Sequence, residues 1–174
     1  MSVERHPAAA NIASLWQGVT LLNSLDDRAY AERLAPAGRN GVGCQMRHCI
    51  DFYSCFLAGL RDGRIDYARR ERNLRVEEDR CHAVDRLEAV IAELSRLEPT
   101  AVHTALEIRL DPRGRDEPEW CRSSTLRELQ FLLSHTIHHY ALIASLLERR
   151  GVRVRDELSG FGVAASTLEH WASF

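Results

Sequence analysis

The chain has 174 residues and a mass of 19.8 kDa, which is the size of one domain. Hydrophobic residues make up 45% and charged residues 28%, a composition that excludes a disordered or collagen-like protein. The 23 lysines and arginines nearly balance the 25 aspartates and glutamates, so the chain lacks the basic excess that most nucleic-acid-binding proteins show.

The charge balance predicts no nucleic-acid partner, and three further features predict a cytoplasmic protein with no membrane partner. No apolar run approaches the roughly 18 residues of a membrane span, and residues 1–7 lack the apolar core of a signal peptide. The number of cysteines is odd, and they show no CxxC pairing, which favours free thiols in a reducing compartment. These cysteines are Cys44, Cys49, Cys55, Cys81 and Cys121.

Apolar residues recur at three- and four-residue steps in four stretches, which predicts four amphipathic helices. The stretches are residues 12–25, 43–60, 79–97 and 125–150. They predict an all-α fold, a four-helix bundle formed by a single domain over residues 1–174. The first stripe includes Leu15 and Trp16. The fourth helix begins with a capping box, in which Thr125 and Glu128 satisfy free amides, and ends at Gly151.

The segments between the helices are also informative. Residues 61–78 are polar, rich in arginine and too long for a tight turn, so they predict a crossover connection. Apolar and polar residues alternate from Val102 to Leu110, and the turn-forming residues 112–118 follow. This pattern predicts a short extended ribbon between helices 3 and 4, with its pairing partner left open. The tail after residue 151 is expected to be a loop and a final turn on the outside of the bundle.

The fourth predicted helix carries two histidines on its apolar side. At about 100° per residue around the helix axis, His139 lies about 40° from His135. Leu142 and Glu128 lie within about 20° of His135. The solvent side is formed by other residues, and His138 lies at its margin. We therefore expect His135 and His139 to point into the bundle, one turn apart.

The second predicted helix carries a third histidine near the edge of its apolar arc. Phe52 lies about 40° from His48 on the apolar side. Arg47 and Asp51 turn toward the opposite side, which we expect to face solvent. His48 is therefore expected to face a pocket.

A core that holds three imidazoles must satisfy them, because burying an unpaired polar group costs about 1–3 kcal/mol. A divalent ion satisfies all three, and histidines at positions i and i+4 can chelate one ion. Three protein ligands with an open position are typical of a catalytic site. Two alternatives stay open: a metal-free cluster joined by hydrogen bonds, and a structural site closed by Cys44 or Glu128. Cys44 can also be a small core residue, and Glu128 a helix cap.

Two helical segments, Met46–Tyr53 and Ser134–Ile143, resemble the DinB-like (YfiT-like) superfamily of metal-dependent proteins. Residues 63–72 and 161–168 are similar to one bacterial branch of it. The resemblance implies a bundle with crossed connectivity, a homodimer, and one zinc, nickel or iron ion on His48, His135 and His139. Many members continue the fourth helix after its last histidine with Arg-Gly-Gln, whereas this chain has Tyr140-Ala-Leu.

The resemblance implies three kinds of characterised relatives, which are thiol transferases, maleylpyruvate isomerase-like enzymes and a domain of sulfoxide synthases. We therefore expect an enzyme that acts on a small molecule through a metal-bound thiolate or water, as a thiol transferase or a hydrolase. A low-molecular-weight thiol is the expected co-substrate. Four residues of the crossover are candidate pocket residues: Asp66, Tyr67, Arg70 and Arg72. The alternative is a non-catalytic, metal-stabilised bundle that serves in binding or stress response.

Overall fold

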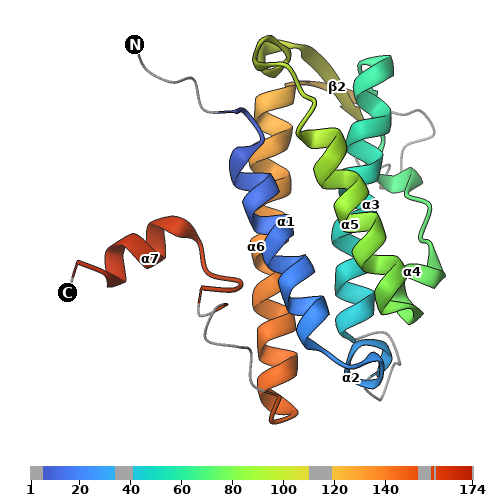
Figure 1. Ribbon diagram of the computed structural model, residues 1–174. Helices are drawn as coiled ribbons and strands as arrows, with labels where there is room; N and C mark the ends of the chain where they lie inside the picture. Colours follow the sequence, from blue (N-terminus) through green and yellow to red (C-terminus); the bar gives the residue numbers. More distant parts are fainter. Residues whose placement is uncertain (1–5, 34–40, 110–118, 153–157, 159, 174) are drawn as a thin grey trace.

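The computed structural model describes residues 6–33, 41–109, 119–152, 158 and 160–173. Four long helices pack lengthwise into a bundle (Figure 1). They are α1 (Ala9–Ser24), α3 (Val42–Asp62), α5 (Arg80–Leu94) and α6 (Thr125–Arg149). Each corresponds to one of the four predicted helices, so the expectation of a helical bundle is confirmed at that level. A small sheet at one end of the bundle adds a β component.

Most residues of the predicted apolar stripes are buried in one core, as Met46, Ile50 and Leu87 show. Two residues differ from the prediction, because Trp16 is 47% exposed and Leu142 is 39% exposed. The buried face of α6 runs instead along Leu129, Leu132, Thr136, Tyr140, Ile143 and Leu147. His135 and His139 therefore lie at the rim of this face and not at its centre.

The predicted crossover contains short ordered elements. These are β1 (Arg64–Ile65), the 3-10 helix η1 (Tyr67–Arg69) and α4 (Leu74–Glu78), and a further short helix, α2 (Asp27–Ala31), follows α1. Helix α4 covers one side of α3, where Arg47 pairs with Glu77 at 2.5 Å and with Asp51 at 2.9 Å. Asp51 is only 5% exposed as a result, so the prediction that it faces solvent was wrong.

The predicted ribbon is the centre of a three-stranded sheet with the order β1-β2-β3. β2 (Ala105–Arg109) pairs in parallel with β1, Arg64 opposite Glu107, and antiparallel with β3 (Trp120–Ser124), Leu106 opposite Ser123. The strand begins later than predicted, because residues 99–103 form the 3-10 helix η2 (Pro99–His103). Leu110 and residues 112–118 lie outside the described residues.

The ends of α6 confirm one predicted cap and correct the other. Gly151 has a φ of +69°, as expected for a left-handed helix stop. At the other end the cap is Ser124, whose hydroxyl accepts a hydrogen bond from the Arg127 amide at 3.3 Å. Thr125 is already the first helical residue, so the predicted capping box was wrong by one position. This shift frees the Glu128 carboxylate for other partners.

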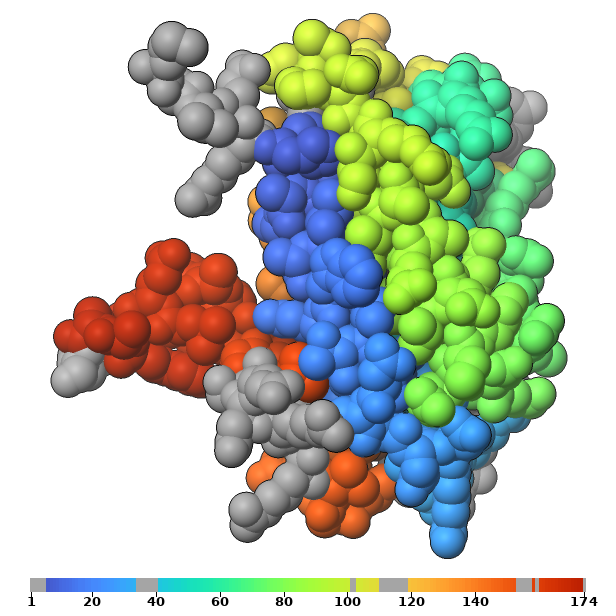
Figure 2. Space-filling view, viewed as in Figure 1, coloured from blue at the N-terminus to red at the C-terminus, as the bar shows by residue number. Residues whose placement is uncertain are grey.

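The tail packs on the bundle through only part of its length. Phe161 stacks on Tyr140 with ring centroids 4.4 Å apart, and both residues are buried. The final helix, α7 (Ala165–Trp171), has no buried residue and projects away from the bundle (Figures 1 and 2). Among all the helices within the described ranges, none combines the length and the apolar character that crossing a bilayer requires.

Candidate metal centre

Three histidine rings from two helices meet at the rim of the bundle. His48 comes from α3, and His135 and His139 come from α6, which packs against α3. The ring centroid of His48 lies 5.0 Å from that of His135 and 4.5 Å from that of His139. The rings of His135 and His139 are 4.5 Å apart, as expected for residues one helical turn apart on one face.

Each ring offers one nitrogen such that all three nitrogens lie within 4.8 Å of one another. Nitrogens around a tetrahedral ion with bonds of 2.0–2.1 Å are roughly 3.3 Å apart, so small ring rotations are enough to close the set. In the part of the chain that the structure describes, these histidines are the one group of His, Cys, Asp or Glu side chains with this spacing. The expected meeting of residues from distant parts of the chain is therefore observed.

Two hydrogen-bonding features match what a metal ligand needs. His135 Nε2 is buried without a hydrogen-bond partner, although its ring is only half-buried. His139 Nδ1 lies 2.5 Å from Oε1 of Gln45 on the neighbouring helix α3. An acceptor oxygen on Nδ1 requires the proton there and leaves Nε2 free to bind a cation. The residues present therefore fit a divalent ion.

The surroundings keep the three rings uncharged. Burial, followed by the neighbouring imidazoles and the positive charge of Arg70, lowers the pKa of His48 to about 3. Burial lowers the pKa of His139 to about 4, with His135 contributing next, and burial also lowers that of His135. Neutral imidazole is the form that binds metal, so the cluster is ready for a cation at neutral pH without losing protons.

Aromatic rings line one side of the triad. The ring of Phe52 lies 4.8 Å from that of His48 and 4.4 Å from that of His135. Phe131 lies 5.5 Å from His135, and Tyr67 stacks on Phe52 at 5.1 Å. These rings exclude water from that side of the centre and support the imidazoles.

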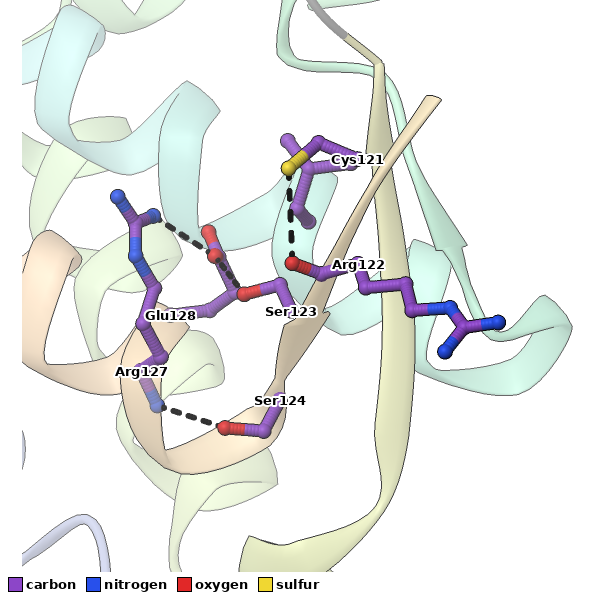
Figure 3. A pocket seen from close by; sticks show the side chains of 7 residues that line it. Cys121, Arg122, Ser123, Ser124, Arg127 and Glu128 are labelled. Carbon is purple, nitrogen blue, oxygen red and sulfur yellow. Dashed lines mark hydrogen bonds and ion pairs between the residues drawn. The ribbon is translucent and has the colours of Figure 1, made fainter.

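Glu128 is fully buried and does not reach the triad. Its carboxylate accepts a hydrogen bond from Tyr67 at 2.8 Å. It also accepts from Ser123 at 2.5 Å and from Arg127 at 2.8 Å (Figure 3). Burial, reinforced by this carboxylate, raises the pKa of the Tyr67 hydroxyl, so the hydroxyl stays protonated and donates. Glu128 therefore positions Tyr67 and is not a fourth member of the histidine cluster.

The pocket in Figure 3 has a volume of about 480 Å³ and is distinct from the histidine cluster. It lies where β3 leads into α6, and no triad histidine lines it. Its lining consists of Ile108, Cys121, Arg122, Ser123, Ser124, Arg127 and Glu128. Two lining residues connect this pocket to the aromatic rings beside the triad: Glu128 bonds to Tyr67, and the Arg127 guanidinium lies 5.5 Å from the centre of the Phe131 ring.

The other predicted site residues have separate positions. Cys44 is half-buried beside Arg47, with 3.9 Å between its sulfur and the guanidinium, and is not part of the triad. His138 is exposed, as predicted, and its ring touches that of His139 at 5.3 Å. Asp66 is held by Arg109 at 2.6 Å, away from the histidines. All five cysteines are free, as expected.

Sequence reasoning missed Gln45 and assigned no role to Phe131. Gln45 precedes His48 by three positions, which places the two on one side of α3. This spacing was a usable signal, but an amide three positions from a histidine is common in helices. Its contact with His139 depends on how α3 and α6 pack, which no single helix reveals.

Comparison with known proteins adds little to this geometry. No known family profile matches the chain, and no solved structure matches it. A curated protein named FK506-binding protein 5, from Rhizopus delemar, is 32% identical over 107 residues. The match covers 61% of this chain and 27% of that protein, so it spans about a quarter of the relative's length.

Proposed function

We propose that the chain binds one divalent metal ion through His48, His135 and His139 and uses it as an enzyme of the DinB-like type. The observation that carries this proposal is the meeting of three neutral imidazoles within 4.8 Å. The orphaned Nε2 of His135 supports it, because a buried imidazole nitrogen without a partner is costly in a protein interior.

The side chains around the triad favour a catalytic site over a closed structural one. Of the two candidates for a fourth ligand, Glu128 is bonded to three other residues and Cys44 lies beside Arg47. Neither belongs to the triad cluster, and three protein ligands with an open position are typical of catalytic metal sites. A structural site is usually closed by four protein ligands.

A bound divalent ion supplies Lewis acidity, which lowers the pKa of a coordinated thiol or water toward neutrality. The protein supplies the rest. Gln45 orients His139, while Phe52 and Phe131 shield one side of the centre from water. We propose transfer of a low-molecular-weight thiol to a small electrophile as the reaction, with hydrolysis as the alternative outcome of the same chemistry.

The ligand assignment is tested by elemental analysis of purified protein loaded with zinc, nickel or iron. We expect about one ion per chain in the wild type and loss of that ion in His135→Ala and His139→Ala. His138→Ala is the matched control, because this exposed histidine lies between the two on the same helix and should retain the ion. Unchanged stoichiometry in His135→Ala would refute the assignment.

The catalytic part of the proposal has a separate test. The loaded protein is assayed with glutathione, bacillithiol or mycothiol against a panel of electrophiles, beside His135→Ala. We expect metal-dependent turnover with one of these thiols and none in the variant. Turnover without any thiol would assign hydrolysis, and no turnover in either assay would favour a metal-stabilised binding module.

A further inference from the structure

The loop between β1 and α4 is held against the bundle at several points. Asp66 accepts from the Ala68 amide at 3.0 Å, and its carboxylate pairs with Arg109 of β2. Its carbonyl accepts from the Cys55 thiol of α3 at 3.1 Å. The Tyr67 hydroxyl donates a hydrogen bond to the Glu128 carboxylate of α6 at 2.8 Å. These contacts with three elements fix the position of the residues that follow.

Arg70 lies three residues after Tyr67 in this loop, and its side chain lies over the aromatic rings beside the triad. Its guanidinium carbon is 4.3 Å from the centre of the Phe52 ring, and one amino group donates to the Tyr67 carbonyl at 2.5 Å. Its Nε is buried and has no hydrogen-bond partner. Among the described residues, no carboxylate lies within ion-pairing distance of this guanidinium, whereas neighbouring Arg69 pairs with Asp66.

The Phe52 ring connects Arg70 to the metal centre. The Phe52 ring, on which the Arg70 guanidinium stacks, lies 4.4 Å from the His135 ring and 4.8 Å from that of His48. Arg70 and the triad are therefore close enough for one small molecule to contact both.

Three carboxylates around Arg70 are already engaged, and Glu71, the next residue in the chain, is exposed to solvent. Asp51 is paired with Arg47, Asp66 with Arg109, and Glu128 with Arg127 and two hydroxyls. A divalent ion on three neutral imidazoles would add two positive charges beside the guanidinium, with no free carboxylate in this group to balance them. Like charges at close range are unfavourable, so an anion is needed there.

We infer that Arg70 binds a carboxylate of the substrate, next to the reacting group at the metal centre. This inference rests on the metal-dependent function proposed above. A guanidinium presents a planar fork that matches a carboxylate, and one positive charge matches its single negative charge. A phosphate dianion generally requires more donors than the Arg70 guanidinium alone supplies.

The test uses the cobalt-loaded protein and two thiols of similar size, 3-mercaptopropionate and the neutral 2-mercaptoethanol. Absorption of the cobalt ion reports thiol binding without any turnover. We expect wild-type protein to bind the carboxylate thiol at least about tenfold more tightly than the neutral thiol, as for a charge-assisted hydrogen bond. Arg70→Gln should bring this preference close to one, and the matched control Arg69→Gln, whose side chain is 81% exposed, should keep it.

Arg70→Lys provides a second measurement, because it keeps the charge but loses the fork; a preference between those of wild type and Arg70→Gln is expected. It also decides the test if Arg70→Gln does not fold. Cobalt bound with the same thiol preference in wild type and the Arg70 variants would overturn the inference and leave the metal site intact. Failure of cobalt to bind at the triad would overturn both. Inorganic phosphate that displaces the carboxylate thiol better than acetate does would overturn the choice of carboxylate.

Discussion

Helices α3 and α6 carry two polar clusters that differ in how completely the protein satisfies them. In the core, Asn11 of α1 donates to the Tyr53 hydroxyl at 3.0 Å and to the Leu129 carbonyl at 2.9 Å. The Thr136 hydroxyl donates to the Leu132 carbonyl of its own helix at 2.7 Å, and its oxygen accepts from the Tyr53 hydroxyl at 3.4 Å. All of these side chains are nearly inaccessible to solvent. This cluster is closed, because its hydrogen bonds begin and end within the protein.

The histidine cluster begins one residue away, at His135, and is open. His139 has a partner in Gln45, but the buried Nε2 of His135 has none. The three rings are only half-buried, so a ligand can approach from the rim. The comparison separates two uses of polar residues in a bundle: a closed network stabilises the fold, and an open one is suited to binding.

The largest expected effect that distinguishes the clusters is stabilisation by metal. An ion that binds only the folded state at a concentration of 1,000 times its Kd adds about 4 kcal/mol to the free energy of unfolding. Thermal unfolding of protein dialysed against chelator and then loaded with zinc measures this. His135→Ala is the control and should show no rise in Tm with zinc. A rise of equal size in that variant would show that the ion binds elsewhere.

Asn11→Ala should break the closed cluster and leave the open one intact. The substitution removes two buried hydrogen bonds and leaves a cavity, so we expect a loss of about 2–3 kcal/mol in unfolding free energy. Urea unfolding measures the loss, and elemental analysis should show unchanged metal content. Thr20→Ala on the exposed side of α1 should change stability by less than about 0.5 kcal/mol. Loss of metal in Asn11→Ala would mean that the two clusters are not independent.

Gln45→Met tests the link between α3 and the open cluster. Methionine keeps the length of the side chain but cannot accept from His139 Nδ1, so the ring loses its orientation. Loss of such an outer partner typically weakens metal binding by about 10- to 100-fold. Competition with a chromophoric chelator measures the affinity. Gln130→Met, at an exposed position of α6, should leave it unchanged.

The parts of this centre that could be predicted from sequence are those that depend on a single helix. The three- and four-residue period fixes the faces of α3 and α6, and it put His135 and His139 together and His138 outside. The same period misplaced Leu142, because the buried face of α6 passes through Ile143 and Leu147, and Leu142 lies beside it with 39% of its surface exposed. It also misplaced Asp51, since the covering helix α4 belongs to a segment whose polar composition indicated only a connection.

Contacts between different helices and loops could not be predicted from the periodicity of a single helix. The pairing of His139 with Gln45 and of Tyr67 with Glu128 requires the relative positions of helices and loop. The three sheet strands are short, and β1 has only two residues, too few to show a period. Asp66, Tyr67 and Arg70 could be named as candidates from their residue types, but their different roles follow only from what each contacts.

The pH dependence of the metal-free protein should reveal the open cluster. Because burial lowers the pKa of His48 to about 3 and that of His139 to about 4, the unfolded chain binds more protons than the folded protein below about pH 6.5. Stability therefore falls as pH drops from 6.5 toward 4. We expect on the order of 1–2 kcal/mol after allowance for solvent screening at this half-buried site. Urea unfolding with chelator present should give a flatter profile for His48→Gln.

The smallest expected effect applies the same contrast to two neighbouring hydroxyls at the start of α6. The Ser124 hydroxyl accepts a hydrogen bond from the Arg127 amide, whereas the buried Thr125 hydroxyl has no hydrogen-bond partner. Ser124→Ala should cost about 1 kcal/mol, as for loss of a helix N-cap. Thr125→Val keeps the shape and removes the unpaired hydroxyl, so we expect no loss of stability or a small gain. A larger loss in Thr125→Val than in Ser124→Ala, measured by urea unfolding, would restore Thr125 as the cap and reverse the assignment made from the hydrogen bonds.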